Sequence, residues 1–175
     1  DVWSYESLYD NPPANWLQSN MSPGQRLGYD PRLHTINEVN ALQKACLASD
    51  AILVPCNDNP LDAIWDDQPP PPIAAVREQG IEFAGQSADD KRHQIGDVLL
   101  ELGIDATVLT APDSIAWLLN IRGGDVPRTP LPLSFAVLHS DGTVDLFIDE
   151  RKLVPDVKSA FGEEVRRHSP DRLLG

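Results

Sequence analysis

The stretch that decides the fold of this chain is TAPDSIAWLLNIRGGDV, which runs from Thr110 to Val126. Its hydroxyl residue Thr110 is followed three positions later by Asp113, the spacing of a capping box at a helix start. A helix is therefore expected near 111–119. The double glycine Gly123-Gly124 follows, and we expect a positive φ at one or both of these residues, because glycine adopts that conformation without steric cost.

The same capping spacing occurs twice more, at Thr35–Glu38 and at Ser87–Asp90. In each case the hydroxyl can accept a hydrogen bond from a free backbone N–H of the first turn, and the acid complements the helix dipole. Apolar residues at helical spacing follow both sites. We therefore expect helices near 36–49 and 88–102.

Apolar runs between these helices predict strands. The order strand–helix–strand around 36–49 favours a parallel pair with a right-handed crossover, whereas Asp141-Gly142 favours a tight antiparallel hairpin. Pro155 and the basic run 166–168 indicate a last helix over 156–165. The expected fold class is α/β, with a mixed sheet and flanking helices. The strands are expected at 26–30, 51–56, 106–110, 134–139 and 143–148.

Four consecutive prolines, Pro69–Pro72, divide the chain. Proline lacks a backbone N–H and holds a stiff, extended path, so this segment fits neither a helix nor the inside of a sheet. A proline-recognising partner is one interpretation, but a rigid spacer fits the change of pattern on either side. We expect part of a first domain over 1–66, a linker over 67–80 and a second, incomplete domain over 81–175.

The chain has 175 residues and a formal net charge of −13. Nucleic-acid binding depends on Lys and Arg that neutralise phosphates, so nucleic acid is not expected as a partner. No window approaches the roughly 20 apolar residues that cross a bilayer, and the first residues lack a signal-peptide pattern, so we expect neither membrane insertion nor export. Cys46 and Cys56 are expected to be buried thiols in a reducing compartment, although a disulfide between them is left open.

Candidate catalytic residues are scarce. The four histidines do not have metal-ligand spacing, and there is no nucleophile elbow or phosphate-binding loop. We therefore expect no catalytic, cofactor-binding or metal-binding residue in this chain. The candidates for an interface or cleft are Asn120, Arg122 and Asp125. The guanidinium of Arg122 could reach a carboxylate across a cleft, but pairing with Asp125 or support of a domain interface is favoured. Trp117 is expected in the core, and Trp65 is expected to anchor the two domains to each other.

Four motifs in a fixed order carry a family resemblance. The stretch 110–126 is preceded by LGYDPRLHT at 27–35, AIWDDQP at 63–69 and FAGQSADDK at 83–91. Their order and spacing resemble the non-catalytic front part of the three-domain Xaa-Pro aminopeptidases (aminopeptidase P), from about Leu17 to Leu153. The resemblance implies a creatinase N-terminal-like domain, preceded by part of a second, similar domain.

The resemblance also implies what the parent protein does. These enzymes are metallopeptidases that remove an N-terminal residue preceding proline, and their two divalent metal ions, usually manganese, are held in a separate catalytic domain. The 175-residue chain alone is expected to be inactive and to serve domain packing, oligomerisation and active-site access. Proline-containing peptides would be bound through the catalytic domain of a cytoplasmic, homodimeric full-length protein.

A second function class stays open on the sequence. Some histone chaperones resemble aminopeptidases but do not cleave peptides, so the chain could be a binding module of such a protein. The two classes differ in whether the downstream catalytic domain keeps its Asp-Asp-His-Glu-Glu metal ligands.

Overall fold

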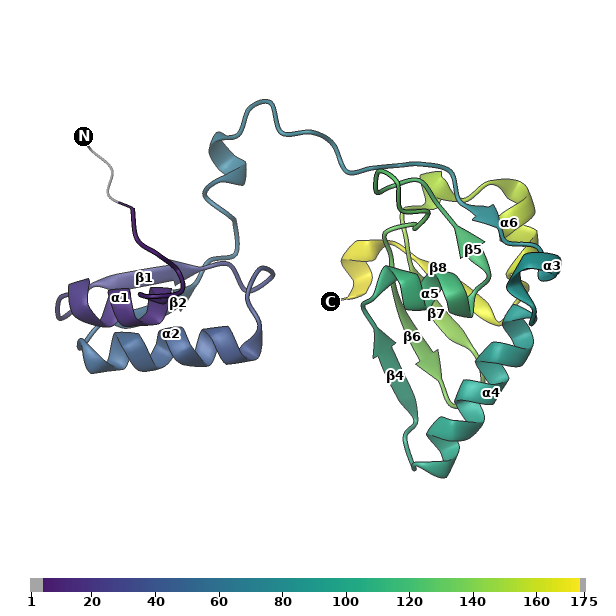
Figure 1. Cartoon of the computed structure of the whole chain (residues 1–175), viewed down its shortest axis with the longest axis horizontal. Coiled ribbons are helices and arrows are strands. Elements are labelled where there is room, and N and C mark those ends of the chain that lie inside the picture. The colour runs from purple at the N-terminus through teal and green to yellow at the C-terminus, as the bar shows by residue number, and fades with distance from the viewer. Residues whose placement is uncertain (1–4, 174–175) are drawn as a thin grey trace. The chain divides into compact units, whose positions relative to one another are not determined.

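The computed structural model describes residues 5–173 and divides the chain into two units, one up to Pro69 and one from Pro70. The first unit contains a strand–helix–strand arrangement preceded by a helix (Figure 1). Its elements are α1 (Pro13–Asn20), β1 (Arg26–Tyr29), α2 (Ile36–Ala48), β2 (Ile52–Pro55) and the short 3-10 helix η1 (Asp62–Ile64).

The parallel pairing expected in the first unit is confirmed. Strands β1 and β2 pair in parallel, with α2 between them in the chain. Helix α2 begins with a complete capping box, in which the Glu38 backbone N–H donates to Thr35 Oγ1 at 3.3 Å and the Thr35 N–H donates to Glu38 Oε2 at 2.7 Å. Hydrogen bonds from the Thr35 backbone and side chain lower the pKa of Glu38. The box fixes where α2 begins.

The two cysteines lie in this unit as free thiols. Cys46 is buried in α2 between the buried residues Ala45 and Ala51, and burial raises the pKa of its thiol. Cys56 is only half-buried, less than its place in an apolar run suggests. The disulfide that the sequence left open is not formed.

The second unit contains a four-stranded sheet with helices (Figure 1). Along the chain its elements are β3 (Arg77–Glu78), α3 (Ile81–Ala84), α4 (Ala88–Glu101), β4 (Ala106–Leu109), α5 (Pro112–Leu118), β5 (Ile121–Arg122), β6 (Phe135–His139), β7 (Val144–Phe147), η2 (Glu150–Lys152), α6 (Pro155–Ala160), β8 (Val165–His168) and η3 (Pro170–Leu173).

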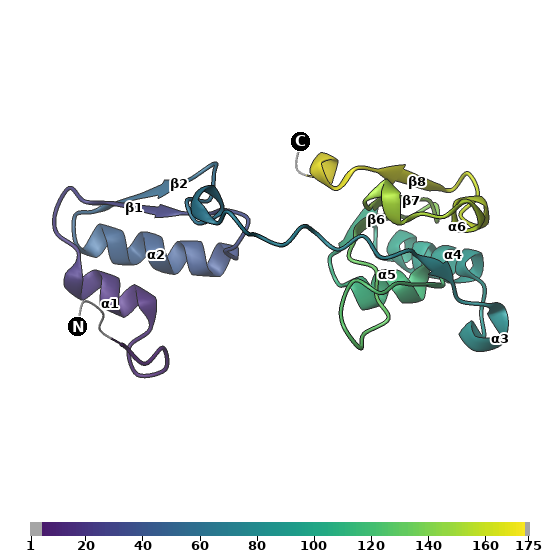
Figure 2. The same cartoon turned by 90° about the horizontal axis from the view of Figure 1, so that it is seen from above.

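The sheet is mixed, which confirms the expected fold class. Its order is β4-β6-β7-β8, with β4–β6 and β6–β7 antiparallel and β7–β8 parallel. Helices α4 and α5 lie on one face (Figure 2). Alternate residues point to that side, and Ala136, Leu138, Val144 and Leu146 are fully buried there with Ile115 of α5.

The turn between β6 and β7 is the expected tight hairpin. Gly142 has φ of +84°, which a residue with a Cβ atom rarely adopts. Its N–H donates to the His139 carbonyl at 3.0 Å, and the Asp141 carboxylate accepts from the Thr143 N–H at 2.9 Å.

The last helix is shorter than expected. It ends at Ala160, and Gly162 with φ of +62° breaks the path. The basic run that was expected to end the helix instead forms β8, where Val165 pairs with Val144. Without β8, the backbone N–H and C=O groups along the outer edge of β7 would be unpaired. Residues 165–168 form hydrogen bonds with that edge, and this pairing outweighs their weak local preference for a helix.

The three hydroxyl–acid sites differ in what they do. Ser87 accepts from the Asp90 N–H at 3.0 Å, so it caps α4 as expected. Thr110 does not cap α5: the N-cap is Ala111, without a side-chain hydrogen bond. Pro112 takes the first helical position, which moves the helix start one residue beyond Thr110 and removes the box spacing.

Helix α4 buries two cationic side chains, while some of the apolar residues expected to be buried are exposed. Val98 and Leu102, which keep helical spacing, are 45% and 67% exposed, whereas Lys91 and Arg92 are each 2% exposed. Arg92 donates to the Gly142 carbonyl at 2.8 Å and to Glu164 at 2.9 Å, and also pairs with Asp89. Through Arg92, the first part of α4 is therefore bonded to the turn between β6 and β7.

The proline-rich segment is exposed from Asp66 to Ile73; Asp66 and Asp67 form a turn, and residues 68–73 belong to no helix or strand. The expected linker over 67–80 extends too far toward the C-terminus. Val76 is buried and forms an isolated β-bridge with Leu153, and β3 pairs with β5. Residues 76–80 are thus part of the folded second unit. Trp65 is 50% exposed, and its expected anchoring role stays a prediction.

Candidate functional site

The turn after α5 carries the three residues that the sequence singled out. Asn120 has φ of +50° and directly follows the C-cap residue Leu119. An Asn in the left-handed conformation is a common helix stop. The stop expected from the double glycine is therefore made by Asn120 instead.

The side chain of Asn120 joins two of the motifs. It is 8% exposed, donates from Nδ2 to the Gln86 carbonyl at 2.8 Å and accepts from Lys91 Nζ at 2.6 Å. Its own carbonyl accepts from the Gln79 N–H at 2.7 Å. Asn120 thus ties the segment before α4 to the end of α5.

Neither glycine of the signature has a positive φ, so that expectation was wrong. Gly123 is required for another reason: a Cβ atom there would lie 2.7 Å from the Pro132 nitrogen. At Gly124 the nearest atom would be the Ala74 Cβ at 3.4 Å, an ordinary contact. The close approach of two backbone segments, and not a left-handed turn, excludes a side chain at Gly123.

Asp125 does not pair with Arg122, which was one of the expected roles. Its side chain is completely buried, and Oδ2 accepts from Lys152 Nζ at 2.7 Å and from the Leu133 N–H at 2.7 Å. Oδ1 accepts from the Ala74 N–H at 3.2 Å. Asp125 therefore fastens the end of the proline-rich segment, the 133 loop and η2 to one another, which is a structural role.

Arg122 lies half-buried beside the end of α5. Its Nη1 donates to the Ala116 carbonyl at 3.2 Å and to the Ile121 carbonyl at 2.8 Å. The structure thus separates the three candidate residues, because Asn120 and Arg122 face Lys91 and the end of α5, whereas Asp125 faces Lys152. Trp117, expected in the core, is 48% exposed, and Lys91 Nζ lies 4.6 Å from its ring centroid.

Lys91 and Lys152 are the polar partners that the sequence interpretation missed. Lys91 precedes Ile95 by four residues and Leu99 by eight, so its position on the buried face of α4 was readable from helical spacing. Burial and the nearby Arg122 lower the pKa of Lys91. For Lys152 no local pattern indicates a partner 27 residues away.

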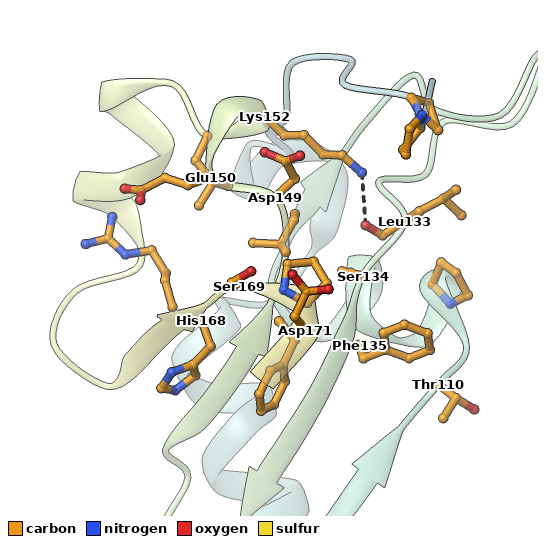
Figure 3. Close-up of a pocket in the computed structure, with 18 residues that line it drawn as sticks. Thr110, Leu133, Ser134, Phe135, Asp149, Glu150, Lys152, His168, Ser169 and Asp171 are labelled. Carbon is orange, nitrogen blue, oxygen red and sulfur yellow. Dashed lines mark hydrogen bonds between the residues drawn. The ribbon is translucent and has the colours of Figure 1, made fainter. Parts of the chain in front are cut away.

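A pocket of about 750 Å³ lies where β4, β7 and β8 end and β6 begins (Figure 3). Phe135, Phe147 and prolines give it apolar walls, and Lys152 at its rim donates to the Leu133 carbonyl at 3.2 Å. Among the described residues of the lining, no hydroxyl group hydrogen-bonds to a histidine, and Ser134 Oγ donates to the Pro132 carbonyl at 3.4 Å.

Two carboxylates of this pocket have a lowered pKa, Glu150 through Lys158 and Asp149 through Arg151. The side chain and the backbone N–H of Arg151 donate to Asp149 and lower its pKa to about 2. A carboxylate with so low a pKa is a weak proton acceptor near neutral pH.

Next to the pocket, Asp145 of β7 binds three neighbours on the sheet face away from α4 and α5. His139 and His168 each approach it through Nε2 at 2.7 Å, and Arg166 Nε donates to it at 2.8 Å. Burial alone would raise the pKa of Asp145, but hydrogen bonds from His168, His139 and Arg166 outweigh burial and lower it to about 2.

This cluster does not fit a metal ion, because the guanidinium already occupies the same carboxylate. Within residues 5–173 there is no group of three or more His, Cys, Asp or Glu residues that could hold a metal. In the same part of the chain, no helix has the length and apolar character that crossing a bilayer requires.

Comparison with known proteins places this fold in a family. The sequence pattern of the Creatinase/Prolidase N-terminal domain matches residues 67–174. A probable Xaa-Pro aminopeptidase P of Aspergillus niger is 34% identical over 86% of this chain and 24% of its own length. Aminopeptidase P1 of Lotus japonicus is 31% identical over 97% of this chain and 26% of its own.

A solved structure extends the likeness to three dimensions. The X-prolyl aminopeptidase of Caenorhabditis elegans, described as a cytosolic enzyme with a di-nuclear active site, matches 98% of this chain and 27% of its own, with a TM-score of 0.83 and 27% identity. The chain spans about a quarter of the length of these relatives. With a pattern match over most of its residues and a second unit of the expected mixed α/β architecture, the chain belongs to the creatinase/prolidase N-terminal domain family.

Proposed function

We propose that this chain is the non-catalytic front part of an Xaa-Pro aminopeptidase, a metallopeptidase that removes an N-terminal residue preceding proline. The observation that carries the proposal is the likeness to the X-prolyl aminopeptidase of C. elegans over 98% of the chain. The relatives named aminopeptidase P support it over 86% and 97% of the chain.

The chemistry is assigned to a separate catalytic domain. Two divalent ions, which we propose to be manganese, would supply the nucleophilic water and polarise the peptide carbonyl there. The di-nuclear site of the C. elegans enzyme supports this division. We assign to the present residues domain packing, oligomerisation as a homodimer and control of access to the active site.

Location and partners follow from the same family. We propose a cytoplasmic enzyme acting on proline-containing peptides, with the cytosolic C. elegans enzyme in support. The net charge of −13 speaks against nucleic acid. The peptidase names of the relatives favour this function over a chaperone-type binding module.

Peptide hydrolysis tests the proposal. We expect the purified 175-residue chain not to release the first residue of an Xaa-Pro peptide even with excess manganese, because residues 5–173 contain no group of side chains that could hold a metal ion. The polypeptide that also carries the catalytic domain should release it, and a chelator should stop the reaction.

Two outcomes would contradict this assignment. Steady release by the peptidase-free chain alone would place catalysis in residues 1–175. No release by the larger polypeptide, together with loss of the Asp-Asp-His-Glu-Glu ligands from its sequence, would favour the binding-module function.

A further inference from the structure

Three cations of the second unit lie near one another without an acidic partner. They are Lys91 of α4, Arg122 of β5 and Arg77 of β3. The chain carries 27 acidic residues and, apart from histidine, 14 basic ones. Five of the basic residues form ion pairs, namely Arg92, Arg151, Lys152, Lys158 and Arg166. Within residues 5–173, none of the three cations pairs with a carboxylate.

Hydrogen bonds place two of these cations side by side. Lys91 Nζ donates to the Trp117 carbonyl at 2.9 Å, and Arg122 Nη1 donates to the carbonyl of the preceding residue, Ala116, at 3.2 Å. Both carbonyls belong to the last turn of α5. The ammonium and the guanidinium therefore share one end of the same helix.

Strand pairing places the third cation, Arg77, next to Arg122. Arg77 and Arg122 are directly opposite each other in the antiparallel pair of β3 and β5. Directly opposite residues extend from the same face of a ladder, and like charges in that position destabilise it. Arg77 is exposed, so its charge lies at the solvent side of the pair.

Arg122 has hydrogen-bond donors that no described residue of the chain accepts from. Lys91 is 2% exposed, and its described acceptors are neutral oxygens of Trp117 and Asn120. Arg122 uses Nη1 for both of its hydrogen bonds to described residues. Its Nε and Nη2 remain as the two parallel donors that a carboxylate accepts in bidentate geometry.

We propose that Arg122 and Arg77 bind a carboxylate of a polypeptide, while the buried ammonium of Lys91 adds positive charge beside Arg122. The half-exposed indole of Trp117, against which Lys91 lies, forms an apolar wall beside this site. The carboxylate comes from an acidic side chain or from a chain terminus, since both present the same two oxygens. The site depends only on residues of the second unit and not on the assignment as a peptidase.

Titration of the 175-residue chain with three acetylated peptides tests the site. The first peptide has one Glu and an amidated C-terminus, the second has Gln and a free C-terminus, and the third has Gln and an amidated C-terminus. We expect the first or the second to bind at millimolar concentration and to shift the NMR signals of Arg122 Nε–H and the Trp117 indole. Whichever binds identifies the source of the carboxylate, and the third should not bind.

Variants show whether the named cations are responsible. Arg122→Gln should weaken binding about tenfold, the loss of one bidentate contact, and Arg122→Lys should recover only part of it. Arg77→Gln should have a smaller effect. Arg172→Gln, which removes an equal charge from the exposed η3, is the matched control and should bind as the parent chain does.

Three results overturn the proposal. One is the absence of any peptide-dependent shift at these three cations. Another is equal binding of the neutral peptide, and so is unchanged binding in an Arg122→Gln variant that has a native melting curve; any one of these results is sufficient.

Discussion

Gly123 lies so close to Pro132 that a Cβ atom at Gly123 would stand 2.7 Å from the Pro132 nitrogen. Backbone atoms cannot move aside as the tip of a long side chain can. We expect Gly123→Ala to reduce the free energy of unfolding by about 1–3 kcal/mol, as overpacking does, and Gly123→Val to reduce it further. Gly124→Ala, with only an ordinary contact ahead of it, is the control and should change stability by less than about 0.5 kcal/mol. Urea unfolding of the variants measures the difference, and equal losses at both glycines would contradict this account.

Asp125 and Lys152 are a buried pair, with side chains 0% and 6% exposed. Removing one partner leaves an uncompensated buried charge, so Lys152→Met should lower the free energy of unfolding by about 3–5 kcal/mol. The double variant Asp125→Leu with Lys152→Met removes both charges, and we expect it to be more stable than Lys152→Met alone. Denaturant titration of Lys152→Met, Asp125→Leu and the double variant tests this, and a double variant whose loss equals the sum of two large single losses would speak against the pair.

At the scale of the elements, Asp145 links the three adjacent strands β6, β7 and β8 through His139, His168 and Arg166. Its pKa is lowered from 3.8 to about 2 in the folded chain. A lowered folded pKa contributes stability above the unfolded pKa, and this contribution is lost as the pH falls through the folded pKa.

The expected consequence is a loss of stability between about pH 4 and pH 2, on the order of 1–2 kcal/mol for this carboxylate. Asp145→Asn cannot titrate, so its stability should fall less across the same window. Asp97→Asn, at an exposed position of α4, should keep the pH dependence of the parent chain. Thermal melts at several pH values compare the three proteins, and identical profiles for Asp145→Asn and the parent would rule out this role of Asp145.

At the scale of the whole molecule, the two units differ in the size of their cores. The buried apolar residues described in the first unit are Ala45, Cys46 and Ala51, whereas the core of the second unit extends from Val76 to Val165. Regions with little buried apolar surface open at lower free energy. In hydrogen exchange we therefore expect faster exchange in residues up to 65 than across 88–150. A single opening with uniform protection would mean that the two units unfold together.

Several features were predictable from the sequence because their physics is local. Thr35 and Glu38 cap α2 across three residues, and Asp141-Gly142 closes a hairpin between adjacent strands. The same reasoning failed at Thr110, where Pro112 shifted the helix start, and at 165–168, where an open strand edge outweighed a helix signal. Of the candidate site residues, Asn120 and Arg122 do lie near each other, but Lys91, which donates to Asn120 and lies near Arg122, was not anticipated.

The sequence by itself determined the α/β pattern, the proline-rich break and the ordered motifs that indicated the family. Those features depend on hydrogen bonds and steric limits within a few residues, so spacing in the chain reveals them. Only the tertiary structure decided that Asp125 pairs with Lys152, 27 residues away, and that Lys91 meets Asn120 across 29 residues. Such partners are selected by packing between elements, because a buried charge is stable only where the fold brings it an acceptor or a counter-charge.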